Sequence, residues 1–96
     1  MIAEYLEAAW GESVDNPTYA DVLDFIEKTK ASDAEHGAFW VGMEDEMVLE
    51  VHQDLTVILV NSADTESEET RTQAKDWQAV KSYYQLFLAG NRDFIN

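Results

Sequence analysis

The sequence contains no cysteine, one proline, four scattered glycines and only six basic residues against twenty acidic ones. The absence of cysteine excludes disulfide bonds, thiolate metal sites and cysteine nucleophiles, and it fits a reducing compartment such as the cytoplasm. Isolated glycines exclude a glycine-rich phosphate-binding loop. No apolar run approaches the roughly 20 residues that cross a bilayer, and residues 1–7 lack the basic stretch of a signal peptide. We therefore expect a cytoplasmic protein without a membrane partner.

The shortage of basic residues leaves a net charge of −14, which is distributed unevenly. Residues 1–70 hold eighteen acids and only two bases, Lys28 and Lys30. A field of this sign repels nucleic acid and anionic lipid and attracts basic surfaces, although it also serves solubility alone. The composition therefore argues against a nucleic-acid partner and favours a basic protein partner.

Ninety-six residues with 46% hydrophobic content suffice for one domain, which we place at residues 1–96. Residues 38–60 form three short runs rich in β-branched and aromatic residues, separated by acidic turns, and this pattern predicts a β-meander. Asn16 as N-cap and Pro17 at the first helical position predict a helix over residues 17–30. Its buried stripe comprises Tyr19, Val22, Leu23 and Ile26, with Phe25 beside it.

A second helix is predicted at about residues 74–89, where Trp77, Val80, Tyr84 and Phe87 recur at helical spacing and Gly90 can end it. Residues 1–10 fit both a helix and a strand, and their pattern favours a helix. Residues 61–75 are polar and predict a loop. The expected fold class is α+β: an antiparallel β-meander sheet of three to five strands with two helices packed on one face.

Standard catalytic patterns are missing from the sequence, so we expect no enzyme activity, no cofactor and no metal. Glu50, His52 and Asp54 alternate on one strand face and could hold a metal weakly, but a solvated strand face is the expected explanation. Two acidic clusters are the candidate partner-binding residues, because crowded like charges repel and suit a basic partner. They are Glu44, Asp45 and Glu46 in the first turn, and Asp64, Glu66, Glu68 and Glu69 in the polar loop.

Trp40 lies on the strand face opposite Phe39 and Val41. If that face of the sheet is open, Trp40 is a natural anchor for a protein interface. Packing in the core is the more frequent location for such a tryptophan, and we expect it here, but Trp40 is kept among the candidate partner-binding residues for the case of an open face.

The order of elements resembles that of the Imm1-like immunity proteins of bacterial polymorphic toxin systems. The resemblance rests on an N-terminal segment ending in Trp10, the helix entry Asn16-Pro17-Thr18-Tyr19, the hairpin-rich stretch, and a closing helix ending in Phe87-Leu88-Ala89-Gly90. It implies that residues 1–10 form an edge strand. It also implies that the protein binds a cognate toxin and blocks it. The acidic charge independently suits a toxin with a basic cleft, such as a nuclease, which the protein would block by occlusion.

Two alternatives use the same residues. A nucleic-acid mimic would bind a DNA-binding protein through its acidic surface. A structural module would assemble into a homo-oligomer through the face or the edge of the sheet.

Overall fold

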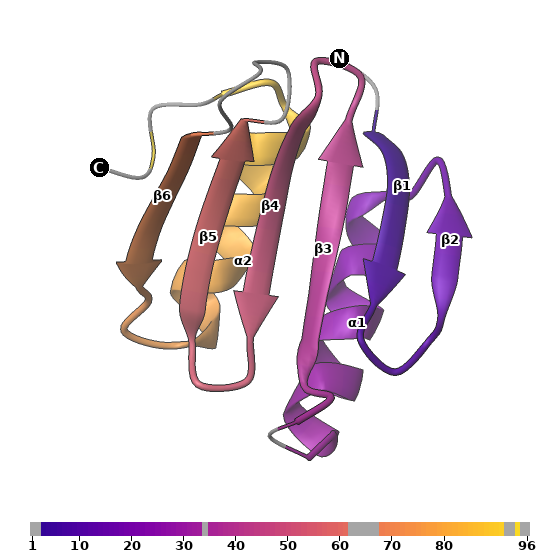
Figure 1. The fold of residues 1–96 in the computed structure, drawn as a ribbon, viewed down its shortest axis with the longest axis vertical. Helices are drawn as coiled ribbons and strands as arrows, with labels where there is room; N and C mark the ends of the chain where they lie inside the picture. The colour runs from indigo at the N-terminus through magenta and orange to yellow at the C-terminus, as the bar shows by residue number, and fades with distance from the viewer. Residues whose placement is uncertain (1–2, 34, 62–67, 92–93, 95–96) are drawn as a thin grey trace.

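The computed structural model describes residues 3–33, 35–61, 68–91 and 94. Its elements in chain order are β1 (Ala3–Ala8), β2 (Ser13–Asp15), α1 (Tyr19–Ala31), β3 (Ala38–Met43), β4 (Met47–His52), β5 (Thr56–Asn61), β6 (Glu68–Gln73) and α2 (Trp77–Leu88). The strands form one antiparallel sheet in the order β2-β1-β3-β4-β5-β6 (Figure 1). Among the described residues, no helix has the length and apolar character that spanning a membrane requires.

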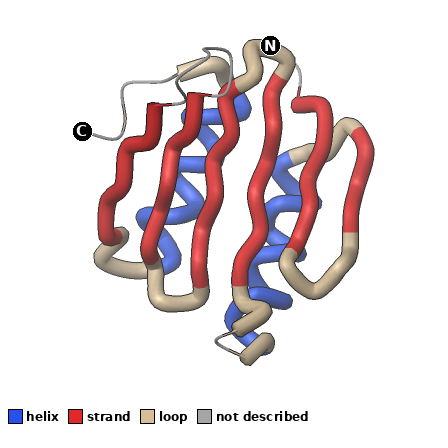
Figure 2. Tube along the Cα trace, viewed as in Figure 1, coloured by secondary structure: helices blue, strands red, loops and turns tan. Residues whose placement is uncertain are grey.

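Both helices lie on the same face of the sheet, as Figure 2 shows. Strands β2 and β3 run in the same direction on either side of β1, so α1 is a crossover connection between them. Helix α2 follows the opposite edge strand and packs back onto β4 beside α1. The other face of the sheet carries no helix in the described part of the chain, and we call it the open face.

The core lies between the helices and the sheet. Inward-facing residues of the central strands, such as Phe39, Leu49 and Val57, are fully buried. Tyr84 of α2 stacks on Phe39 with ring centroids 5.3 Å apart and donates its hydroxyl to the carbonyl of Leu49 at 2.7 Å. Burial raises the pKa of Tyr84 well above its ordinary value. Tyr84 thereby joins α2 to β4 by packing and by a hydrogen bond.

The helix ends show how local sequence sets their limits. Thr18 caps α1 and forms a reciprocal capping box with Asp21, so the helix begins two residues later than the proline pattern predicts. Pro17 precedes the cap and is buried. At the end of α2, the amides of Gly90 and Asn91 donate to the carbonyls of Phe87 and Leu86, and Gly90 has φ 95°. This Schellman arrangement confirms Gly90 as the residue that ends α2.

The two tight hairpins share an unusual backbone. The amide of Glu46 donates to the Met43 carbonyl at 3.0 Å in the β3–β4 turn, and the amide of Leu55 donates to the His52 carbonyl at 2.9 Å in the β4–β5 turn. Glu46 has φ 65° and Leu55 has φ 71°. Both therefore occupy the left-handed position that a three-residue hairpin normally gives to glycine.

The predicted fold class is right, but the sheet has six strands where three to five were expected. Residues 3–8 form β1, so the helix favoured by their pattern is wrong. β1 is also not an edge strand, because β2 lies outside it. Residues 68–73 form β6 within the segment predicted as a loop. The first helix buries Val22, Phe25 and Ile26 as its stripe, whereas Leu23 is only partly buried.

Candidate functional site

The candidate site is the open face of the sheet, which is built from side chains that alternate with the core residues of each strand. The strand registers align these side chains in rows across the sheet. One row reads Asp15, Tyr5, Gly42, Val48, Val60 and Glu69; the next reads Ser13, Glu7, Trp40, Glu50, Ile58 and Arg71. Aromatic and aliphatic side chains of the inner strands, such as Trp40, Val48 and Ile58, thus share this face with acidic ones, and Glu50 of β4 lies between Trp40 and Ile58.

Trp40 sits near the centre of this face and is half-buried. Its indole Nε1–H donates to Glu7 Oε1 of the neighbouring strand at 3.1 Å. The expectation that Trp40 packs in the core is therefore wrong. The reason is topological, because both helices cover the side of β3 that carries Phe39 and Val41. The bond to Glu7 fixes the indole orientation, so its apolar surface is presented in one position.

The ring of Tyr5 lies over Gly42, the residue of the inner strand β3 that carries no side chain. A Cβ placed on Gly42 would lie 2.2 Å from Tyr5 Cζ and 2.3 Å from Tyr5 Cε1. The ring therefore lies directly over the glycine and takes the space that a side chain would fill. Burial, followed by the charges of Glu7 and Glu4, raises the pKa of Tyr5 above its ordinary value.

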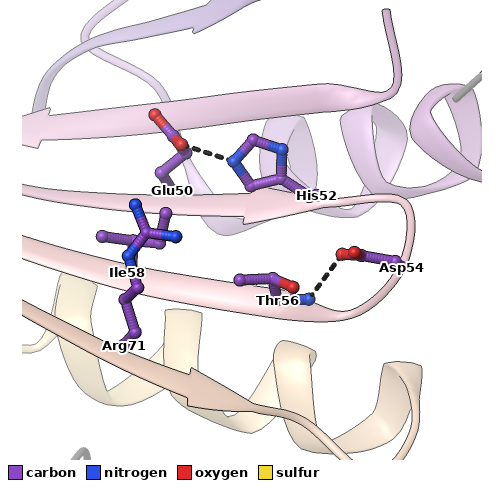
Figure 3. Close-up of a pocket in the computed structure, with 6 residues that line it drawn as sticks. All are labelled: Glu50, His52, Asp54, Thr56, Ile58 and Arg71. Carbon is purple, nitrogen blue, oxygen red and sulfur yellow. Dashed lines mark hydrogen bonds and ion pairs between the residues drawn. The ribbon is translucent and has the colours of Figure 1, made fainter. Parts of the chain in front are cut away.

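A shallow depression of about 290 Å³ opens on this face between β4, β5 and β6 (Figure 3). Its lining residues are Glu50, His52, Asp54, Thr56, Ile58 and Arg71. His52 Nε2 lies 2.5 Å from Glu50 Oε2. Ile58 is only 5% exposed, although it belongs to the open face, so its neighbours shield it from water. The lining of the depression therefore combines one apolar side chain, Ile58, with five polar or charged ones.

Asp54 stands apart from the Glu50–His52 pair, in the turn between β4 and β5. Its carboxylate accepts the backbone N–H of Thr56 at 3.0 Å, and the hydrogen bonds from Thr56 lower the pKa of Asp54. Asp54 therefore stabilises the turn (Figure 3). Within the described residues, no group of three or more His, Asp or Glu side chains is placed to hold a metal ion.

The predicted acidic residues that the structure describes, Glu44, Asp45, Glu46, Glu68 and Glu69, lie at one end of the sheet, where β3 turns into β4 and where β6 begins beside the end of β5 (Figure 1). Glu44, Asp45 and Glu46 form the β3–β4 turn, and Asp45 accepts the Met47 amide at 3.2 Å. Asp64 and Glu66 lie outside the described residues. Glu68 begins β6, and nothing is described of its side chain.

Glu69 points to the open face and pairs with Arg71 two residues later on the same strand. Both Nε and Nη2 of Arg71 lie 2.7 Å from Glu69 Oε1, and the two side chains are 66% and 45% exposed for Arg71 and Glu69. Such an exposed pair contributes little to stability, so both groups remain accessible to other partners.

In comparisons with protein-family models, curated proteins and solved structures, no match to this chain was found.

Sequence reasoning identified Trp40 and Glu69 but missed their neighbours Tyr5, Glu7 and Arg71. Tyr5 and Glu7 were missed because the segment was predicted as a helix, and Arg71 because its segment was predicted as a loop. The signal that could have found Glu7 is the period-two alternation of residues 6–10, which also fits a strand.

Proposed function

We propose that this protein is a small cytoplasmic binding protein that docks on a basic partner protein and blocks it by occlusion, in the manner of a toxin immunity protein. The observation that carries the proposal is the open face, where half-buried aromatic and aliphatic side chains lie beside Glu50 and no helix of the described residues covers them. Apolar surface bordered by polar residues often marks a site of protein–protein interaction.

The composition of the open face supports a protein partner. Trp40 and Tyr5 are of the residue types that most often supply binding energy at protein interfaces. Both are held in place before binding, Trp40 by Glu7 and Tyr5 by its seat on Gly42. Side chains that are already ordered lose less conformational entropy when a partner arrives.

The charge of the face supports a basic partner. Its described acids are Glu7, Asp15, Glu50 and Glu69, against the single base Arg71. The acidic β3–β4 turn adds Glu44, Asp45 and Glu46 at one end of the sheet. Opposite charge accelerates the encounter of two proteins and selects against wrong partners. A toxin with a basic cleft, such as a nuclease, presents the complementary surface.

The experiment is affinity capture from a lysate of the source organism at low salt, with salt elution and mass spectrometry. Wild type is compared with Trp40→Ala and Glu50→Lys on the open face, and with Glu27→Lys on the exposed side of α1. Glu27→Lys changes the net charge as much as Glu50→Lys does.

We expect a basic protein to be retained by wild type and Glu27→Lys and to be lost by both open-face variants. The captured protein should then lose its activity when wild type is added. Equal capture by all four proteins would show that the open face is not the interface. A captured protein that is acidic or stays bound at high salt would contradict the role of charge.

A further inference from the structure

The two edges of the sheet differ in length and in backbone regularity. At one edge, β2 has three residues and is followed by Asn16, whose φ is 51°. At the other edge, β6 has six residues, and all six pair in register with β5. Among the described residues, none pairs with the outer side of β6. A regular edge strand presents backbone N–H and C=O groups to which another strand can add.

The side chains of β6 carry a charge pattern that can recognise itself. Glu69 and Arg71 point to the open face, and Thr70 and Thr72 alternate with them on the other side. In an antiparallel two-fold pair of β6 strands that continues the sheet, residues opposite each other share a face. When Thr70 lies opposite Thr70, Glu69 of each copy lies opposite Arg71 of the other.

Neighbouring registers are unfavourable. A shift by one pair in one direction places Glu69 opposite Glu69, and a shift in the other direction places Arg71 opposite Arg71. Like charges directly opposite each other destabilise a pair of strands, whereas opposite charges stabilise it. Electrostatics therefore favours a single register in which each copy keeps its open face on the same side of the joined sheet.

We propose that a second copy of this chain adds to the outer edge of β6, antiparallel and two-fold symmetric about Thr70. The chain from Arg71 onward carries the least negative charge of the sequence, which limits repulsion between the copies beyond Glu68 and Glu69 of β6 itself. Residues 71–96 hold Arg71, Lys75, Lys81 and Arg92 against Asp76 and Asp93, whereas the rest of the chain is strongly acidic. The proposal is independent of the proposed function, because pairing at the edge leaves the open face uncovered.

The test is sedimentation equilibrium from micromolar to millimolar protein at physiological salt. The proteins are wild type, Glu69→Arg, Arg71→Glu and the control Glu27→Arg on α1. Wild type and control should form dimers with the same affinity. Each single variant at β6 should be monomeric. In its homodimer, the register centred on Thr70 would place two like-charged pairs across the interface.

An equal mixture of Glu69→Arg and Arg71→Glu should form a heterodimer, since every cross-strand pair is again of opposite charge. Within each variant strand, residues 69 and 71 still carry charges of the same sign in the mixture. Restored ion pairing inside one copy therefore cannot explain the formation of the heterodimer. As a second measurement, hydrogen exchange of the β6 amides in wild type should slow as the protein concentration rises. A monomeric wild type at every concentration, or a mixture that stays monomeric, would overturn the proposal.

Discussion

Gly42→Ala tests whether Tyr5 and Gly42 form one packing unit on the open face. The three atoms nearest to the added methyl group all belong to Tyr5, at 2.2, 2.3 and 2.6 Å. Contacts between carbon atoms are favourable at about 3.5–4.0 Å, so the ring must leave its seat. Overpacking of this kind costs roughly 1–3 kcal/mol. Gly42 has no left-handed backbone, so the expected cost comes from the clash with Tyr5 and not from backbone strain.

The same substitution should have the opposite sign once the ring is gone. In a Tyr5→Ala background, Gly42→Ala should stabilise the protein by about 0.5–1 kcal/mol, because glycine inside a strand is less favourable than alanine. Urea unfolding of the four proteins in this double-mutant cycle should therefore give a coupling energy of at least about 1.5 kcal/mol. A coupling energy below about 0.5 kcal/mol would refute the close packing of the Tyr5 ring against Gly42.

NMR titration of the Tyr5 ring in Gly42→Ala supplies an independent readout. Burial is the main cause of the raised pKa of Tyr5. The displaced ring should therefore titrate closer to the ordinary tyrosine value than it does in wild type.

Three further predictions concern the fold. Phe87→Ala should lower the free energy of unfolding in urea by about 3–5 kcal/mol, because Phe87 is fully buried. Glu46→Gly should raise the free energy of unfolding by up to about 1 kcal/mol, because glycine adopts the left-handed backbone without strain. Leu55→Gly should not raise the free energy of unfolding, because this substitution also removes a side chain that packs against the core. The hydrogen bond from Lys28 lowers the pKa of the Glu12 carboxyl in the folded protein. Ionised Glu12 therefore stabilises the fold at pH values above the pKa that it has in the unfolded chain, and this contribution is lost as the pH falls through the pKa of the folded state. Thermal melts of wild type and Glu12→Gln should therefore differ at neutral pH and converge in acid.

The sequence was sufficient for the meander and for the end of α2. The runs at residues 38–60 became β3, β4 and β5, and the acidic tripeptide became a turn as predicted. Gly90 ended α2 because its left-handed conformation satisfies two carbonyls at once. These are local signals, and tertiary structure does not compete with them.

The missed strands depended on partners far away in the sequence. Residues 3–8 contain alanine, glutamate and leucine, which favour a helix in isolation, yet β3 and β2 supply hydrogen bonds on both sides. Residues 68–73 lack apolar alternation because they form the sheet edge, where Thr70 and Thr72 are only partly buried. The position of Trp40 followed from the number of helices, since two helices on one side leave the other face open.

The strand order also bears on how quickly the chain folds. From β3 to β6, each strand pairs with the next one along the chain, and two of the three connections are tight turns. Short closures cost little entropy, so this four-stranded part of the sheet should form early and rapidly. The pairing of Ala3 with Met43 closes a loop that contains β2 and α1. Addition of β1 to the meander is therefore the step expected to limit the folding rate.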